Sequence, residues 1–154
     1  MKFTRLILFA FFILSFPLLT GAQTTGKKIV PQNSGASNQA AKSSPAYAEI
    51  LLLKTELESQ LEDFSADYTD DFPKAQELRY QLDLIQKETN KILSVNAADA
   101  NKLTIAMGKL FVRKIELETN LWNLKLKYKD DYPEVKRAKR KLEVFERAIR
   151  EILP

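Results

Sequence analysis

The chain has no cysteine and no histidine among its 154 residues, and it has only 4 glycines. Because it cannot form a disulfide, an apolar core alone must hold the fold together. Thiolate and imidazole catalysis are excluded, and no serine lies in the context of a hydrolase nucleophile. So few glycines cannot form a loop that cradles phosphate groups. We therefore predict a protein that is not an enzyme and that has no cofactor-binding site.

Long apolar runs are also absent, apart from one near the start of the chain. A basic stretch with Lys2 and Arg5 precedes the 15-residue run LILFAFFILSFPLLT, and Thr20 and Ala22 stand at positions −3 and −1 of a signal-peptidase site. The run is shorter than the roughly 20 residues that span a bilayer. We predict a signal peptide over residues 1–22, with an uncleaved membrane anchor as the alternative. The mature protein is then exported, periplasmic or extracellular, with no spanning membrane segment.

Residues 23–45 contain mostly small and polar side chains. Such a segment cannot bury enough apolar surface to offset the entropy that it would lose on ordering. We predict a flexible tether here, so that the folded part covers residues 46–154.

The folded part contains an internal repeat, because residues 50–93 recur as residues 110–153 at an offset of 60. A period of this size is typical of a repeated helical unit that cannot bury its apolar stripe alone. We divide the chain into repeat 1 (residues 46–95) and repeat 2 (residues 96–154). The positions that recur unchanged 60 residues later are Lys54, Glu56, Leu57, Glu58, Leu61, Tyr68, Asp70, Asp71, Pro73, Leu82, Ile92 and Leu93.

Apolar residues spaced by three, four or seven positions, such as Ile50, Leu57 and Leu61, predict amphipathic helices in both repeats. A proline interrupts each repeat, Pro73 in the first and Pro133 in the second. Proline disfavours helical geometry in the residue before it but fits the first turn of a helix. We predict an all-α fold in which four helices form two hairpins, packed as a bundle or an elongated coiled coil.

The link between the repeats, SVNAADANKL, contains neither glycine nor proline. Asn96 followed by Asp99 is typical of a helix start of the capping-box type, with Asp in place of Glu. A helix running straight through would place both residues on the apolar seam, where burial is costly. We favour a short turn here, and a continuous helix is the alternative.

Acidic and aromatic side chains lie around the proline of each predicted turn. The carboxylates can accept hydrogen bonds from the first amides of the next helix and face the positive end of its dipole. They supply too few oxygens for calcium, which takes about six or more, so we predict no metal site. We expect Phe72 and Tyr132 to pack the turns. The turn residues are Tyr68, Asp70, Asp71, Phe72 and Pro73 in repeat 1, and Tyr128, Asp130, Asp131, Tyr132 and Pro133 in repeat 2.

Lys54 and Lys114 interrupt otherwise apolar seams, each four residues before a glutamate. We favour lysine stems that lie along the seam with the ammonium in solvent, paired with Glu58 and Glu118. A polar site that sets the helix register is the alternative.

Charge is divided between the two repeats. Residues 46–95 carry 11 acidic and 5 basic side chains, a net charge of −6, and residues 96–154 carry 9 acidic and 14 basic, a net charge of +5. We favour a solvated basic face with some attraction to the acidic repeat, and an anionic polysaccharide or lipid surface is the alternative partner. Without interleaved aromatic residues to stack bases, we predict no nucleic acid partner. The basic face consists of Lys136, Arg137, Lys139, Arg140, Lys141, Arg147 and Arg150.

The unit K-x-E-L-E-x-x-L, followed by Y-x-D-D-[FY]-P and a second amphipathic helix, resembles the periplasmic coiled-coil hairpin of polysaccharide co-polymerases, the chain-length determinant and exopolysaccharide export proteins. The resemblance covers the hairpins, about two thirds of the chain, although Phe72 and Tyr132 replace the common histidine of the family's turn. The family's two transmembrane helices and its cytoplasmic kinase module have no counterpart here. The resemblance therefore implies a detached, duplicated arm with a role in the cell envelope, and not the control of polymer length.

These observations predict a non-enzymatic exported coiled-coil protein that acts as an interaction or scaffold protein of the cell envelope, linked to polysaccharide export. Its partner would be another protein or a second copy, bound through the apolar helix seams. The alternative is a periplasmic holdase-type chaperone that grips unfolded clients.

Overall fold

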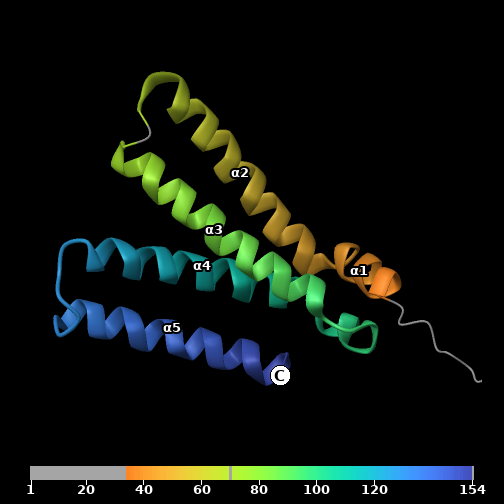
Figure 1. Ribbon diagram of the computed structural model, residues 1–154. Helices are drawn as coiled ribbons and strands as arrows, with labels where there is room; N and C mark the ends of the chain where they lie inside the picture. The colour runs from red at the N-terminus through yellow and green to blue at the C-terminus, as the bar shows by residue number, and fades with distance from the viewer. Residues whose placement is uncertain (1–33, 70, 154) are drawn as a thin grey trace, which may run out of the picture. The chain divides into compact units, whose positions relative to one another are not determined.

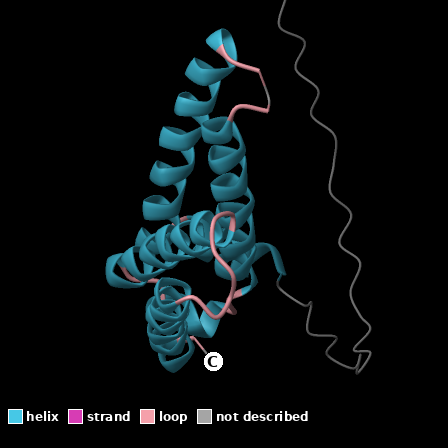
Figure 2. Ribbon diagram, turned by 90° about the vertical axis from the view of Figure 1, so that its left-hand side faces the viewer, coloured by secondary structure: helices cyan, strands magenta, loops and turns pink. Residues whose placement is uncertain are grey.

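The computed structural model describes residues 34–69 and 71–153, and within them the chain is helical without any strand (Figure 1). The predicted all-α class is confirmed. Loops join the helices (Figure 2). The predicted signal peptide, residues 1–22, lies outside the described residues. The helices are α1 (Ser34–Lys42), α2 (Pro45–Asp67), α3 (Pro73–Ser94), the 3₁₀ helix η1 (Ala97–Lys102), α4 (Ile105–Lys125) and α5 (Pro133–Ile152).

Helix α1 corrects the prediction of a flexible tether over residues 23–45. Residues 23–33 lie outside the described part, but residues 34–42 are helical and α1 packs against α2, α3 and η1. Ala41 is fully buried. The tether prediction rests on the near absence of large apolar side chains in this segment. Alanine, however, favours helix, and its small side chain can be buried completely against close neighbours.

The long helices start at equivalent positions of the two repeats. Ser44 Oγ accepts a hydrogen bond from the Tyr47 amide at 3.2 Å, and Thr104 Oγ1 accepts one from the Met107 amide at 3.3 Å. These N-caps begin α2 and α4, and they lie 60 residues apart.

The helices pack as two pairs, which we call the first pair (α2 and α3) and the second pair (α4 and α5). Helix α4 lies along α5 and also packs against both helices of the first pair (Figure 1). It approaches α2 closely at Gly108, where an added Cβ would lie 2.8 Å from Glu49 Cβ and 2.9 Å from Ala46 Cα. The absence of a side chain at residue 108 therefore allows α4 to pack this closely against α2.

The link between the pairs contains a break, as favoured from the sequence. Helix α3 ends at Ser94, and η1 precedes the start of α4. The predicted capping box is wrong, however, because Asn96 makes no side-chain capping bond; its Nδ2 instead donates to Asp99 Oδ2 at 3.4 Å. Thr104 caps α4 instead.

The apolar core includes most of the predicted seam and a stripe that the prediction missed. Ile50 and Leu57 are buried as expected. Phe111 and Ile115 of α4 lie off the predicted seam but belong to the same buried cluster. Helix α4 thus has apolar residues on two sides, because it packs against α5 and against the first pair.

Candidate functional site

The predicted turn residues lie at the ends of the two pairs. Helices α3 and α5 begin at the prolines that predicted helix starts, Pro73 and Pro133. Their N-cap residues are Phe72 and Tyr132, and neither makes a side-chain capping bond. The predicted capping role is therefore wrong for Asp71, Asp130 and Asp131, and Asp70 lies outside the described residues. These aspartates precede the aromatic N-cap, so they lie before the position from which a side chain usually reaches the first free amides.

Asp130 has a different role, since its carboxylate lies between two lysines. Its Oδ2 is 3.2 Å from Lys139 Nζ, and its Oδ1 is 3.4 Å from Lys125 Nζ. Hydrogen bonds from Lys139 and then Lys125 lower the pKa of Asp130. The carboxylate therefore ties the end of α4 to the start of α5.

Aromatic side chains pack both turns, as expected. The ring centroids of Tyr68 and Phe72 are 4.5 Å apart, and those of Tyr128 and Tyr132 are 4.3 Å apart. All four side chains are nevertheless more than a third exposed. Each pair therefore ends in a stacked aromatic surface that is open to solvent.

The two seam lysines differ in their surroundings. Lys54 follows the favoured interpretation, because its Nζ pairs with Glu58 at 3.2 Å and both side chains are exposed. Lys114 does not, since its side chain is only 8% exposed. The predicted pairing of Lys114 with Glu118 is confirmed at 2.7 Å, but the ammonium is buried and not in solvent, so that part of the favoured prediction is wrong. A role of Lys114 in setting the helix register stays a prediction.

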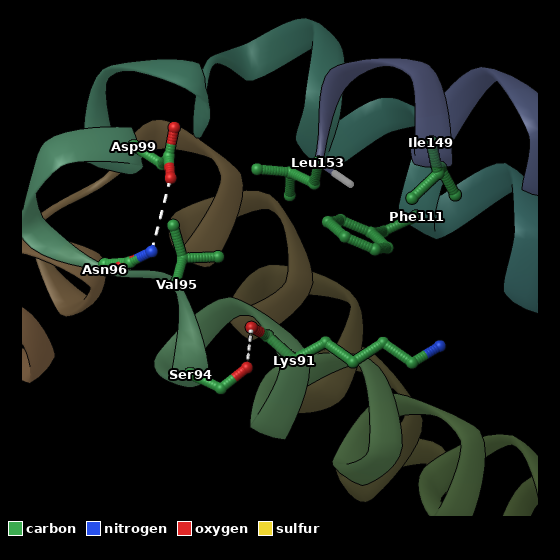
Figure 3. Close-up of a pocket in the computed structure, with 8 residues that line it drawn as sticks. All are labelled: Lys91, Ser94, Val95, Asn96, Asp99, Phe111, Ile149 and Leu153. Atoms are coloured by element: carbon green, nitrogen blue, oxygen red, sulfur yellow. Dashed lines mark hydrogen bonds between the residues drawn. The ribbon is translucent and has the colours of Figure 1, made fainter.

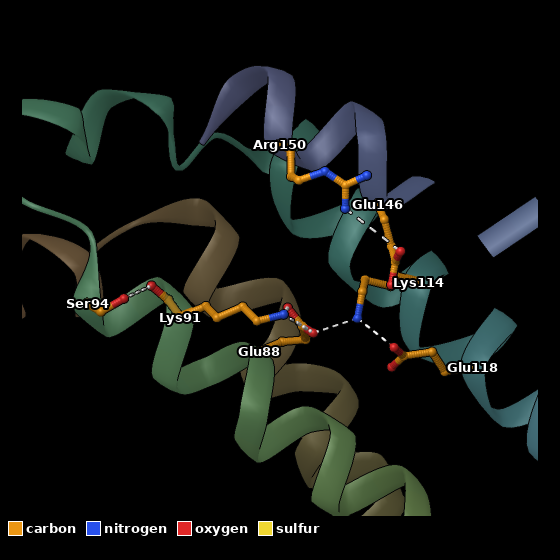
Figure 4. A network of polar contacts seen from close by, with 7 residues as sticks. All are labelled: Glu88, Lys91, Ser94, Lys114, Glu118, Glu146 and Arg150. Atoms are coloured by element: carbon orange, nitrogen blue, oxygen red, sulfur yellow. Dashed lines mark hydrogen bonds and ion pairs between the residues drawn. The ribbon is translucent and has the colours of Figure 1, made fainter. Parts of the chain in front are cut away.

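Lys114 joins the second pair to the first through a buried ion network (Figure 4). Its Nζ donates to Glu88 Oε1 of α3 at 2.8 Å and to Glu118 Oε1 of its own helix at 2.7 Å. Glu88 is only 2% exposed and also accepts hydrogen bonds from Lys91. Burial alone would lower the pKa of Lys114, but the hydrogen bonds to Glu118 and Glu88 outweigh it and raise that pKa.

The raised pKa has a direct consequence for stability. A lysine whose pKa is higher in the folded state contributes its stabilisation in full below its unfolded pKa and loses it only as the pH rises through the folded value. Lys114 should therefore stay charged at neutral pH. Glu118 Oε2 is buried without a hydrogen-bond partner, so one polar atom of the network is unsatisfied.

Two further contacts connect α3 with α4. Asn123 Nδ2 donates to Glu77 Oε2 at 2.8 Å. The rings of Tyr80 and Trp122 stack with centroids 4.9 Å apart. Together with the ion network, these contacts define the surface of the first pair that α4 covers.

A pocket of about 260 Å³ lies where α3, η1, α4 and α5 meet (Figure 3). Phe111, Ile149 and Leu153 supply apolar lining. The polar side chains at its edge already have partners, since Ser94 Oγ donates to the Lys91 carbonyl at 2.8 Å. The pocket is slightly smaller than typical sites for small molecules, which begin at about 300 Å³.

The predicted basic face is not one surface. Lys139 pairs with Asp130, and Arg150 lies 3.8 Å from Glu146 beside the ion network (Figure 4). Three other residues, Arg137, Arg140 and Lys141, come together at a groove between α4 and α5. Lys136 and Arg147 are exposed and do not line that groove.

We call this hollow the α4/α5 groove, and its volume is about 710 Å³. Leu124, Ala138 and Val144 provide its apolar lining, and Val144 is 52% exposed. A partly exposed apolar lining with a basic rim is suited to binding an acidic amphipathic surface. The groove is lined by Asn120, Leu124, Glu134, Arg137, Ala138, Arg140, Lys141 and Val144.

Neither a metal site nor a membrane span occurs in the part of the chain that the structure describes. Residues 34–69 and 71–153 contain no group of three or more acidic side chains that could hold a metal ion. No helix within these residues is both long and apolar enough to cross a bilayer.

Comparison with protein-family models, curated proteins and solved structures found no match for this chain. The resemblance to polysaccharide co-polymerase hairpins stays a prediction. The function therefore has to be argued from the chain's own surfaces.

Proposed function

We propose that this chain is a non-enzymatic exported protein of the cell envelope that acts as a scaffold by binding another protein. The α4/α5 groove carries the proposal, because it joins an apolar lining that includes the exposed Val144 to three basic residues, Arg137, Arg140 and Lys141. An acidic amphipathic helix that covers such a surface gains free energy by burying apolar area, and the charges orient the partner.

We further propose that the two helix pairs are copies of one repeated hairpin. The equivalent N-caps, Ser44 and Thr104, support this, and so do the equivalent helix starts at Pro73 and Pro133. The proposal of export rests on the apolar leader, residues 1–22, and the link to polysaccharide export rests on the resemblance of the turn motif.

A holdase-type chaperone is the second candidate, and the aromatic turns favour it. Tyr68, Phe72, Tyr128 and Tyr132 are exposed at the ends of the pairs, where they could contact unfolded clients. A holdase grips many sequences, whereas a scaffold holds one partner in one geometry.

Photo-crosslinking in the exporting cell separates the two functions. A photoreactive side chain at Val144, in the groove, should give one discrete adduct, and Arg137→Glu/Arg140→Glu/Lys141→Glu in the same chain should remove it. The same probe at Lys127, which is exposed outside the groove, is the matched control. The absence of a discrete adduct at Val144 would refute the scaffold proposal.

Light scattering of an aggregating model client provides the second arm. We expect the mature chain to leave client aggregation unchanged. Strong suppression at near-stoichiometric ratios, lost when Tyr68, Phe72, Tyr128 and Tyr132 are replaced by Ser, would establish the holdase instead. Recovery of the chain without its leader from the exported fraction tests the localisation.

A further inference from the structure

The α4/α5 groove occupies the place on the second pair that α4 itself covers on the first pair. Arg137 and Arg140 of the groove stand 60 residues after Glu77 and Tyr80, which contact Asn123 and Trp122 of α4. Val144 likewise stands 60 residues after Leu84, which is buried. What is covered on the first pair is therefore open on the second.

The side of α4 that packs against the first pair has an exposed counterpart on α2. We call it the outer face of α2, and its residues stand 60 positions before residues on the covered side of α4. Leu51, which corresponds to the buried Phe111, is 45% exposed, and Thr55, which corresponds to the buried Ile115, is exposed. The outer face of α2 consists of Ala48, Leu51, Thr55, Glu58, Glu62 and Asp63, all exposed.

The two open surfaces have opposite charge. The outer face of α2 carries Glu58, Glu62 and Asp63, and the groove carries Arg137, Arg140 and Lys141. Among the described residues, no ion pair joins these two sets within the chain. Glu58 pairs with Lys54 and Arg137 lies 3.8 Å from Glu134, but all four side chains are more than a third exposed, so these pairs are weak. A neighbouring molecule can therefore compete for the charges of both surfaces.

Within one molecule, the outer face of α2 cannot cover the α4/α5 groove in the way that α4 covers the first pair. With 3.6 residues per helical turn, Asn120 and Leu124 of the groove lie on the side of α4 opposite to Phe111 and Ile115. Those two buried residues belong to the core cluster that includes the first pair. The groove therefore opens away from the first pair, and its occupant has to come from elsewhere.

We propose that the occupant is a second copy of this chain, whose α2 outer face docks in the α4/α5 groove. This inference rests on the proposed function, since it names the partner of the same groove. The contact is head-to-tail: each copy offers its groove to one neighbour and its α2 face to another. Such a heterologous contact continues as an open chain of copies or closes as a ring.

The contact between copies should be weaker than the contact within one chain. Ala148 stands where Glu88 stands in the first pair, so the buried ion pair with Lys114 has no equivalent for Lys54. Ala48 also stands where Gly108 stands in α4, and at Gly108 the two helices α2 and α4 lie too close for an added Cβ. Because the exposed charges contribute most of the orientation, association should weaken as salt rises.

The test is sedimentation of the mature full chain over a range of concentrations and salt. We expect species larger than a dimer that dissociate at high salt. Arg137→Glu/Arg140→Glu/Lys141→Glu should weaken association by about tenfold or more, and Glu58→Lys/Glu62→Lys/Asp63→Lys should do the same. The control, Lys127→Glu/Lys129→Glu/Lys136→Glu, makes the same charge change as the groove variant but at exposed residues outside the groove.

Mixing the two reversed variants gives the decisive arm. Each variant alone has like charges on both surfaces, but in the mixture every groove finds a face of opposite charge, so assembly should return. Circular dichroism checks that each variant is folded. A chain that stays monomeric, a control that weakens assembly as much as the groove variant, or a mixture that fails to reassemble would overturn the inference. A discrete Val144 adduct to a different protein would overturn it too, yet leave the proposed scaffold function standing.

Discussion

The first and second helix pairs start their helices at equivalent residues, but they differ in what covers them. Helix α4 covers the first pair, and there Glu77, Tyr80 and Glu88 have become partners of α4 side chains. On the second pair the corresponding residues are Arg137, Arg140 and Ala148, and the first two rim an exposed groove. Residues that stand 60 positions apart can therefore contact a neighbouring helix in one pair and line an exposed groove in the other, depending on which helix packs beside them.

The largest expected difference between equivalent positions concerns the seam lysines. Lys114→Met should lower the free energy of unfolding by about 3–5 kcal/mol, because it leaves the buried carboxylate of Glu88 without its closest interhelical partner. Lys54→Met should cost about 1 kcal/mol or less, since its ion pair is exposed. Urea titration followed by circular dichroism measures both.

A double variant shows whether the loss of stability comes from the unpaired carboxylate of Glu88 or from the missing lysine side chain. Glu88→Leu/Lys114→Met should recover much of the stability, because replacing a whole buried ion pair by apolar side chains is often neutral. Equal losses for the two single lysine variants would show that Lys114 is no more buried in solution than Lys54.

The next effect concerns Gly108 and its counterpart Ala48. Gly108→Ala should destabilise the fold by about 1–2 kcal/mol, because overpacking against Ala46 and Glu49 outweighs the gain in helix propensity. Ala48→Gly should cost only about 0.5–1 kcal/mol through lost helix propensity. A stabilised Gly108→Ala variant in thermal unfolding would show that α2 and α4 are not in close contact.

Alanine substitutions near the helix starts should separate the residues that cap a helix from the aspartates that were predicted to cap one. Ser44→Ala and Thr104→Ala should each lower stability by about 1 kcal/mol, since each removes the acceptor for a first-turn amide. Asp71→Ala and Asp131→Ala should change it by less than about 0.5 kcal/mol, because neither side chain caps a helix. Calorimetry would contradict this assignment if the aspartate variants lost as much as the cap variants.

The smallest effect is the pH dependence of the turn in the second pair. Because the pKa of Asp130 is lowered in the folded state, its contribution to stability is present above its unfolded pKa and is lost as the pH falls through the folded value. Lys139→Met should raise that pKa toward its ordinary value, as NMR titration of the carboxyl carbon would report. Lys136→Met, at an exposed lysine of the same helix, is the control. An unchanged Asp130 pKa after Lys139→Met would contradict the ion pair.

Much of the fold could be predicted because its signals are local. Proline restricts its own backbone and that of the preceding residue, so Pro73 and Pro133 predicted where α3 and α5 begin. Apolar spacing likewise predicted helices and most buried residues such as Ile50 and Leu57. The capping prediction failed because a cap depends on which residue has the first non-helical backbone angles, and that residue proved to be aromatic in both turns.

Local signals thus determined the helical class, the turns and the division of charge, since each depends on residues close together in the chain. Tertiary structure alone decided that Ala41 is buried, that Lys114 reaches Glu88 across 26 residues, and that α4 needs apolar side chains on two sides. It also decided that Arg137, Arg140 and Lys141 share a groove while Lys139 and Arg150 lie elsewhere. The physical reason is that burial and electrostatic environment are set by whichever helix packs alongside, and the two helix pairs, which share a local pattern, meet different neighbours.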